Sequence, residues 1–184
     1  MDVKIIAKIE KPEAVDAFDD ILEETDGVMI ARGDLGVETP FDKVPVLQKQ
    51  LVHKCIIKSK PVIIATQMME GMISNLLPTR AEATDVSNAV LDGADAVMLS
   101  GETSVGKYPV EVIRNMQKVI SATEASGFYL KHDHIPEENS PWYLSDSLSY
   151  NACTLADSIG AVGIVVFTYL GGTALNIASH RPDA

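Results

Sequence analysis

The sequence predicts an α/β fold built on a parallel sheet, and three observations carry this prediction. Four short apolar runs, each typical of a buried strand, alternate with amphipathic helical patterns up to Ala125. Each run is followed by polar or charged side chains. An apolar content of 46% with 22% charged residues excludes an intrinsically disordered chain of 184 residues.

The strand predictions cover residues 3–9, 28–31, 62–65 and 96–99. Three of the helices that follow them begin at Pro12, Pro45 and Pro109, because a proline in the first helical turn needs no hydrogen-bond donor. The remaining helix follows Thr79 and ends at Gly93, a typical C-terminal cap. These elements predict four consecutive βα repeats, half of the eight that close a parallel barrel.

A second unit is predicted after the four repeats. Residues 131–141 are polar and contain two prolines, as is typical of a linker. Residues 145–159 have a helical pattern, residues 162–168 have the pattern of a fifth strand, and a final helix follows Gly172. This helix, strand and helix predict the beginning of another domain.

Charge and cysteine content exclude several classes of protein. A formal charge of −11 and a pI near 4.7 argue against a nucleic-acid binder, which needs a basic face. No apolar run approaches the roughly 20 residues that span a membrane, and the N-terminus lacks the apolar core of a signal peptide, so we expect a soluble protein. Cys55 and Cys153 are isolated within helical patterns, and we expect two packed thiols rather than a disulfide or a metal cluster.

Lys8 and Glu10 give the first indication of chemistry. Side chains alternate along a strand, so these two project together while their apolar neighbours project to the other face. Asp34, Thr66 and Ser100 follow the next three strands. A cation beside carboxylates suits a site for a metal ion and an anionic substrate. The same residues also fit ordinary roles, as a surface ion pair, a helix cap and a β-branched strand residue.

Several motifs, in order along the chain, resemble the pyruvate kinase family. Residues 3–15 fit the active-site signature of that family, and similar motifs follow at residues 31–36, 65–68, 78–82, 91–95 and 99–103. The resemblance implies that residues 1–127 are the second half of a TIM-type (β/α)8 barrel. It also implies a linker at residues 128–143, and the first helix, strand and helix of a three-layer α/β C-terminal domain in residues 144–184.

The resemblance assigns a charged core to the site. Lys8 resembles the family's catalytic lysine, which contacts the transferring phosphoryl group. Glu10 and Asp34 resemble the two carboxylates that hold Mg²⁺ or Mn²⁺. Gly33 and Asp34 lie where the family offers backbone N–H groups to the substrate carboxylate, and a glycine allows that close approach.

The remaining site residues and the reaction follow from the same resemblance. Thr66 resembles a threonine near the substrate methylene, and Ser100 resembles a serine of the adjoining proton-relay region. A threonine hydroxyl is too weak an acid at neutral pH, so we expect water or a neighbour to protonate the enolate. The implied reaction is phosphoryl transfer from phosphoenolpyruvate to ADP, which yields pyruvate and ATP in cytoplasmic glycolysis. The intact enzyme would be a homotetramer that also uses K⁺.

Parts of the family's pattern are absent or altered. The K⁺ ligands and most nucleotide contacts belong to the preceding half of the barrel, so we expect the chain alone to be an inactive fragment. Leu170 stands where the family often has a serine that binds an effector phosphate, which argues against such control. His132 and His134 receive no role, and Arg80 and Glu82 are expected to stabilise the barrel rim or a subunit contact.

Two other functions remain open. One is a metal-dependent carbon–carbon lyase of the barrel type, which would use Glu10 and Asp34 on a pyruvate-type enolate and would cleave a 2-oxo acid without nucleotide. The other is a non-catalytic truncated product that folds only with a complementary half or a second copy. Unpaired apolar strands at residues 3–9 and 97–99 would favour the latter.

Overall fold

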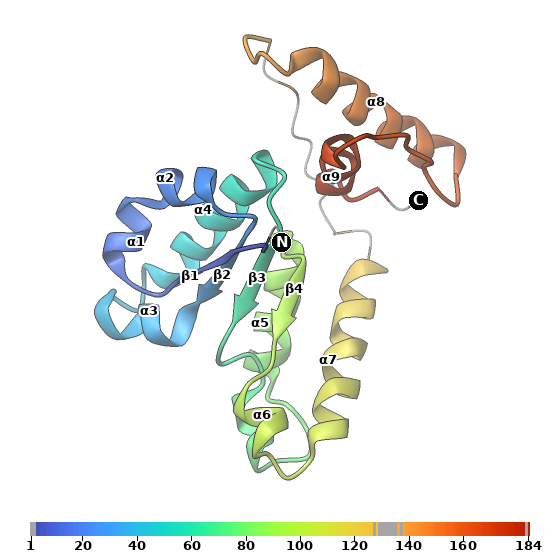
Figure 1. Cartoon of the computed structure of the whole chain (residues 1–184). Helices are drawn as coiled ribbons and strands as arrows, with labels where there is room; N and C mark the ends of the chain where they lie inside the picture. The colour runs from blue at the N-terminus through green and yellow to red at the C-terminus, as the bar shows by residue number, and fades with distance from the viewer. Residues whose placement is uncertain (1–2, 127, 129–135, 137, 183) are drawn as a thin grey trace.

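The computed structural model describes residues 3–126, 128, 136, 138–182 and 184 (Figure 1). Its strands are β1 (Ile6–Ile9), β2 (Gly27–Ala31), β3 (Val62–Ala65) and β4 (Ala96–Met98). The helices that alternate with them are α1 (Pro12–Asp16), α2 (Phe18–Glu24), α3 (Arg32–Glu38), α4 (Val44–Ile57), the 3₁₀ helix η1 (Glu70–Ile73), α5 (Arg80–Leu91), α6 (Gly101–Ser104) and α7 (Pro109–Glu124). Two further helices, α8 (Tyr143–Ile159) and α9 (Gly172–Ser179), follow.

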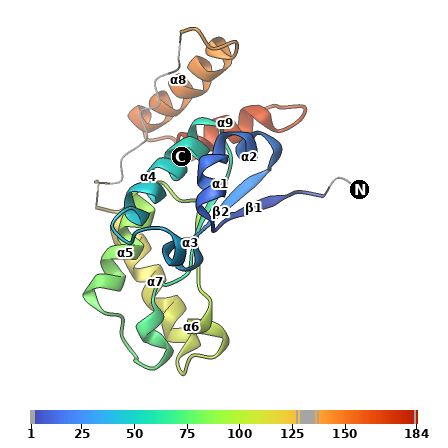
Figure 2. The ribbon, with the colours of Figure 1, turned by 90° about the vertical axis from the view of Figure 1, so that its left-hand side faces the viewer.

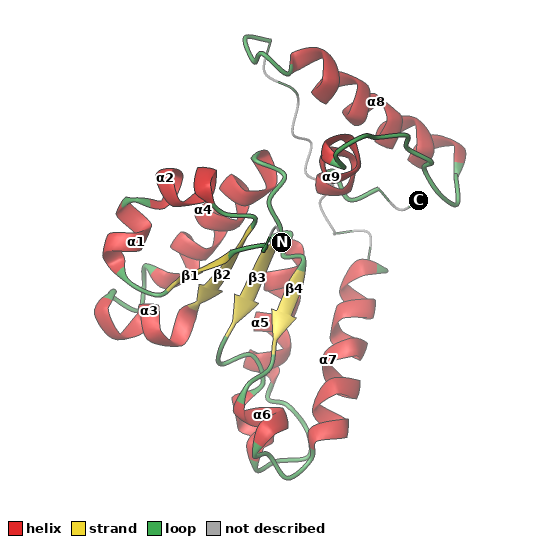
Figure 3. Cartoon of the chain, in the orientation of Figure 1, coloured by secondary structure: helices red, strands yellow, loops and turns green. Residues whose placement is uncertain are grey.

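The four strands form one parallel sheet in the order β1-β2-β3-β4. Ile9 lies beside Ile30, Ile30 beside Ile64, and Ile64 beside Val97. Each crossover returns the chain to the same end of the sheet, so the loops after all four strands lie at that end (Figure 3). This end is called the carboxyl end below. The arrangement confirms the predicted series of four βα repeats.

The core lies between the sheet and the longer helices. Helix α4 contacts β2 and β3, α5 packs against α7, and a side view places α4 and α5 to one side of the strands (Figure 2). The buried members include Phe18, Leu22, Val28, Ile30, Leu51, Cys55, Val86, Ala89, Val112 and Met116. This apolar layer fixes the strands, and through them the loops at the carboxyl end.

The first predicted helix is two helices. Ala17 lies between α1 and α2 with φ −93° and ψ 17°, outside the regular helical range. The bend leaves α1 with no buried residue and turns Phe18 and Leu22 of α2 into the core. Helix α3, η1 and α6 are short helices that follow β2, β3 and β4 at the carboxyl end.

The predicted fifth strand is wrong for this structure. Residues 162–168 are in no strand, and the exposed fractions of Val162, Val165 and Phe167 are 101%, 86% and 96%. A strand is defined by hydrogen bonds to a neighbouring strand, and no described strand pairs with this segment. The two predicted helices on either side are present as α8 and α9, which pack against each other. The predicted linker lies largely outside the described residues.

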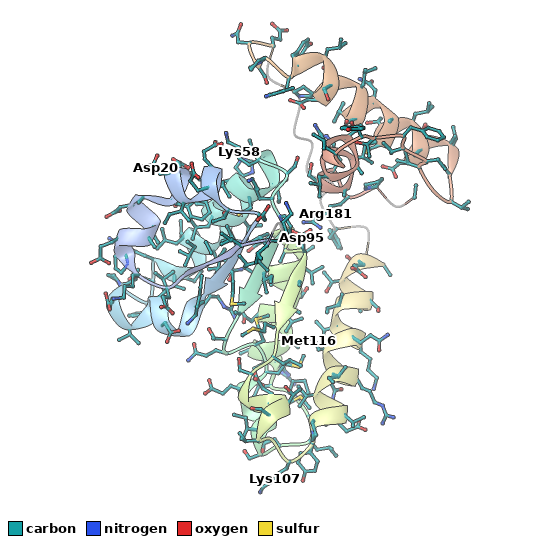
Figure 4. The ribbon with its side chains drawn as sticks, in the orientation of Figure 1. Asp20, Lys58, Asp95, Lys107, Met116 and Arg181 are labelled. Carbon is teal, nitrogen blue, oxygen red and sulfur yellow. The ribbon has the colours of Figure 1, made fainter. Side chains whose placement is uncertain are left out.

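The segment after α9 contacts the barrel part at the end of the sheet opposite the loops described above. Arg181 pairs with Asp95 at 3.1 Å, just before β4, and the two side chains lie together in Figure 4. Asp95 also accepts the backbone N–H of Val62 at 2.8 Å, where β3 begins. Of the helices in the described part, none is long and apolar enough to cross a membrane.

Candidate active site

A lysine and two carboxylates meet at the carboxyl ends of β1 and β2. Lys8 Nζ donates to Asp34 Oδ2 at 3.0 Å and also contacts Glu10 Oε2. Ile9, between Lys8 and Glu10, is 1% exposed, which confirms the predicted alternation of faces. Asp34 reaches the cluster from the first turn of α3. The sequence therefore correctly placed these three side chains together.

The ion pairs stabilise the charged forms of Lys8 and Asp34. The hydrogen bond to Glu10, and then that to Asp34, raises the pKa of Lys8 above its ordinary value. The hydrogen bond from Lys8 lowers the pKa of Asp34. Lys8 is therefore an ammonium and Asp34 a carboxylate at neutral pH. All three side chains remain between about a third and three-fifths exposed, so the cluster is open to small ligands.

The cluster fits a divalent cation. Its two carboxylates already converge on one positive charge, and hard oxygen donors are the ligands that Mg²⁺ prefers. Proteins commonly hold Mg²⁺ through one or two carboxylates, with water and substrate phosphate completing the shell. Within the described residues there is no group of three or more His, Cys, Asp or Glu side chains that could hold a metal. Glu10 and Asp34 thus match a substrate-completed site rather than a closed structural one.

Gly33 and Thr66 form the adjoining contact between the ends of β2 and β3. The backbone N–H of Gly33 donates to Thr66 Oγ1 at 2.7 Å, and that hydroxyl donates to the Ala65 carbonyl at 2.6 Å. A Cβ at position 33 would lie 3.1 Å from Thr66 Oγ1, closer than a side chain normally tolerates. In this structure the group that approaches Gly33 closely is the Thr66 hydroxyl. The role of this N–H towards a substrate stays a prediction.

Ser100 lies at the end of β4, one strand beyond Thr66. Its backbone N–H donates to Glu102 Oε2 at 2.7 Å, and Ser100 is exposed. Glu102 is 2% exposed and also accepts the N–H of Met69 at 3.2 Å. The structure therefore joins the β3 and β4 loops through Glu102. It brings Ser100 to the same end of the sheet as Lys8 and Thr66.

Two residues of this region hold its loops together and were given no role by the sequence predictions. One is Arg32, which donates to both carboxylate oxygens of Asp85, at 2.6 and 2.7 Å, and to the Thr66 carbonyl at 2.9 Å. Glu102 is the other. Arg32 directly follows β2 and Glu102 lies four residues after β4, so a charged residue close after an apolar strand was the available signal. Their partners are distant in sequence, so pattern alone does not identify their contacts.

Glu82 has the predicted role at the rim. It closes a capping box with Thr79 at the start of α5 and accepts the N–H of Gly71 in η1. Burial opposes ionisation of Glu82, but the hydrogen bonds from Thr79 and Gly71 together lower its pKa. The side chain of His180 stacks edge-on against Tyr150, far along the chain from these loops. His132 and His134 lie outside the described residues.

Comparison with known proteins decides the family. The model of the pyruvate kinase barrel domain matches residues 1–113. The chain belongs to the pyruvate kinase family. Pyruvate kinase from Corynebacterium efficiens is 49% identical over 183 residues, which cover 98% of this chain and 38% of the relative. Pyruvate kinase from Clostridium acetobutylicum is 44% identical over 182 residues, 99% of this chain and 38% of the relative.

Solved structures agree with this assignment. The crystal structure of a pyruvate kinase from Cryptosporidium parvum superposes with a TM-score of 0.86 at 42% identity. That match covers 98% of this chain and 37% of the other. The sheet is thus part of a TIM-type barrel, as the pyruvate kinase resemblance implied. The chain spans about 38% of the length of the curated relatives it matches.

Proposed function

We propose that the protein carrying this chain transfers a phosphoryl group from phosphoenolpyruvate to ADP and releases pyruvate and ATP. The observation that carries the proposal is the ammonium of Lys8 between the carboxylates of Glu10 and Asp34, at the carboxyl end of a partial barrel. Barrel enzymes carry their chemistry at this end. Membership of the pyruvate kinase family supports the choice of substrates.

Lys8 would act on the transferring group. Phosphoryl transfer spreads negative charge over three equatorial oxygens, and a fixed cation beside them lowers the barrier. Because its pKa is raised, Lys8 brings a full positive charge to that position at neutral pH. Glu10 and Asp34 engage two of the three donors of the ammonium, so the third is available to an oxygen of the transferring group.

Glu10 and Asp34 would hold the divalent cation, Mg²⁺ or Mn²⁺. When bound, that cation supplies positive charge to the substrate oxygens. The two carboxylates would keep it at the ends of β1 and β2, beside Lys8. Gly33, at the start of α3, would orient the substrate carboxylate through backbone N–H groups.

Thr66 would face the carbon that receives a proton. Its hydroxyl is fixed by the Gly33 N–H and by the Ala65 carbonyl, so its position is defined before substrate binds. Because the hydroxyl is a weak acid, it would relay a proton from water or from the Ser100 region instead of supplying one itself. We assign Ser100 to that relay.

The rest of the proposal concerns the complete enzyme. K⁺ would be bound outside residues 1–184, the assembly would be a homotetramer, and glycolysis would take place in the cytoplasm. We propose that residues 1–184 alone are inactive, because four strands leave the barrel open. Val3, Ile5 and Ile6, before and at the start of β1, are 70%, 57% and 55% exposed, as expected at an edge strand that is paired on one side only. The relatives described above do not favour the lyase alternative.

A coupled assay of the natural gene product tests the proposal. Pyruvate should form only when phosphoenolpyruvate, ADP and a divalent cation are all present, and Lys8→Met should lower the rate by about 100-fold or more. Lys58→Met is the matched control, because Lys58 pairs with Glu23 on the helical surface, away from these loops. Absence of ADP-dependent pyruvate formation in the wild type, or equal rates in the two lysine variants, would refute the proposal.

A further inference from the structure

The backbone directly after β3 has an unfavourable conformation. Thr66 has φ 70° and Gln67 has φ 56°, so two consecutive residues with side chains occupy the left-handed region. This region is costly for residues other than glycine, asparagine and aspartate, and it persists only where surrounding contacts enforce it. Thr66 is also the residue whose hydroxyl binds Gly33.

Arg32 makes the enforcing contacts. Its side chain is 11% exposed, and its guanidinium donates to the carbonyl of Thr66 at 2.9 Å. The same nitrogen lies against the sulfur of Met68, so the guanidinium contacts the turn on both sides of Gln67. Arg32 is the residue immediately before Gly33. The segment that contributes Gly33 and Asp34 therefore also fixes the backbone of Thr66.

Side chains of α4 and α5 hold the guanidinium of Arg32 in place. Asp85 of α5 accepts two hydrogen bonds from it, at 2.6 and 2.7 Å, in the bidentate geometry that matches a guanidinium. Gln48 of α4 accepts a third at 3.2 Å and in turn donates to Asp92 at 2.8 Å. This polar chain links α4 and α5 to the Thr66 carbonyl. A lysine at position 32 lacks the planar fork and cannot reproduce these bonds together.

We propose that Arg32 is the positioning residue of the site, and that its bidentate pair with Asp85 holds the left-handed turn that presents the Thr66 hydroxyl. This inference rests on the proposed function, because it names the residue that places Thr66 for proton delivery. Arg32 lies behind the substrate-facing loops, among α3, α4 and α5, and acts through Thr66. The matching carboxylate is Asp85, whose loss leaves the guanidinium without its anchor.

The first test is independent of turnover and reads the turn itself. Hydrogen exchange at the Gly33 amide is measured by NMR in the natural gene product and in Arg32→Lys. The amide donates to Thr66 Oγ1, so a released turn should speed its exchange by about 10-fold or more. Thr79→Ala, which removes the cap of α5 without touching Arg32, is the matched control and should speed Gly33 exchange by no more than about 5-fold, the effect of its lower overall stability. Equal exchange in Arg32→Lys and wild type would overturn the inference.

The second test separates positioning from general stability. Arg32→Lys and Asp85→Asn should each lower kcat about 10-fold or more while leaving the affinity for Mn²⁺ unchanged, since Glu10 and Asp34 are intact. Proton exchange at the methyl group of pyruvate should fall in parallel, whereas Thr79→Ala should retain both activities. Faster Gly33 exchange with unchanged kcat would overturn the catalytic part of the inference. A wild type without turnover would refute the proposed function, and the exchange measurement would still decide whether Arg32 holds the turn.

Discussion

Glu102 offers a quantitative test of how the loops at the carboxyl end are held together. Its side chain is 2% exposed and accepts the N–H groups of Ser100, at 2.7 Å, and Met69, at 3.2 Å. Glu102→Gln keeps the shape of the side chain but replaces one acceptor oxygen with an NH₂ donor. The amide oxygen will remain with Ser100, which makes the shorter bond. The N–H of Met69, a fully buried residue, then faces another donor.

The expected cost follows from that single lost acceptor. A buried N–H left without a partner costs about 1–3 kcal/mol, and we expect about 2 kcal/mol for Met69. In a domain of this size each kcal/mol lowers Tm by roughly 2–4 °C, so Glu102→Gln should lower Tm by about 4–8 °C. Thermal unfolding followed by circular dichroism measures the shift, and urea unfolding gives the free energy of unfolding independently.

Glu38→Gln is the matched control for this prediction. Glu38 ends α3 and is exposed, so the same change of chemistry there should alter Tm by no more than about 1 °C. If Glu102→Gln behaves like Glu38→Gln, the carboxylate does not hold the β3 and β4 loops together, and our account of the Ser100 region is wrong.

Three further predictions concern the surroundings of the site. Thr79→Ala should cost about 1 kcal/mol and lower Tm by roughly 2–4 °C, because the capping box of α5 loses its acceptor for the Glu82 N–H; an unchanged Tm would contradict the assigned cap. The N–H of Ile5, and then Lys4, lower the pKa of Asp26, so its contribution to stability is present above the ordinary value of 3.8 and is lost as pH falls through the lower folded value. Asp26→Asn should therefore be less stable than wild type at pH 7, and the gap in Tm should close on acidification; a gap that is constant with pH would exclude this linkage. Burial, and then the charge of Asp95, raise the pKa of Cys55 to about 12, so a thiol reagent at pH 8 should modify Cys55 quickly only after unfolding in urea, and fast labelling of the native protein would contradict this burial.

Local pattern was sufficient for the four strands and the long helices of the barrel part, but not for the bend at Ala17 or for the short helices η1 and α6. Strand alternation put Lys8 and Glu10 on one face, and parallel topology put Asp34 and Thr66 at the same end of the sheet, because each rule depends only on neighbouring residues. The prolines at positions 12 and 109 begin α1 and α7 as predicted, and α4 begins one residue before Pro45. The prediction of a strand at residues 162–168 was wrong for the converse reason. Their apolar pattern is correct for a strand, but pairing needs a partner that the described residues do not provide.

The positioning contacts could not be predicted because they join residues far apart in sequence. Arg32 reaches Thr66 and Asp85, which lie 34 and 53 positions away, and Glu102 reaches Met69 across 33 positions. Such contacts depend on how the βα units pack, which no local pattern specifies. The left-handed turn at Thr66 is likewise invisible in sequence, since neither Thr66 nor Gln67 is a residue that favours it.

The central claim is that Glu10 and Asp34 hold the divalent cation beside Lys8, and Mn²⁺ binding tests it most directly. Free Mn²⁺ is counted by electron paramagnetic resonance during titration of the natural gene product, with and without phosphoenolpyruvate. We predict that Asp34→Asn and Glu10→Gln each weaken Mn²⁺ binding by about 10-fold or more, whereas Glu38→Gln leaves it unchanged. Equal Mn²⁺ affinity in all four proteins would contradict the account, because the cation would then be bound elsewhere.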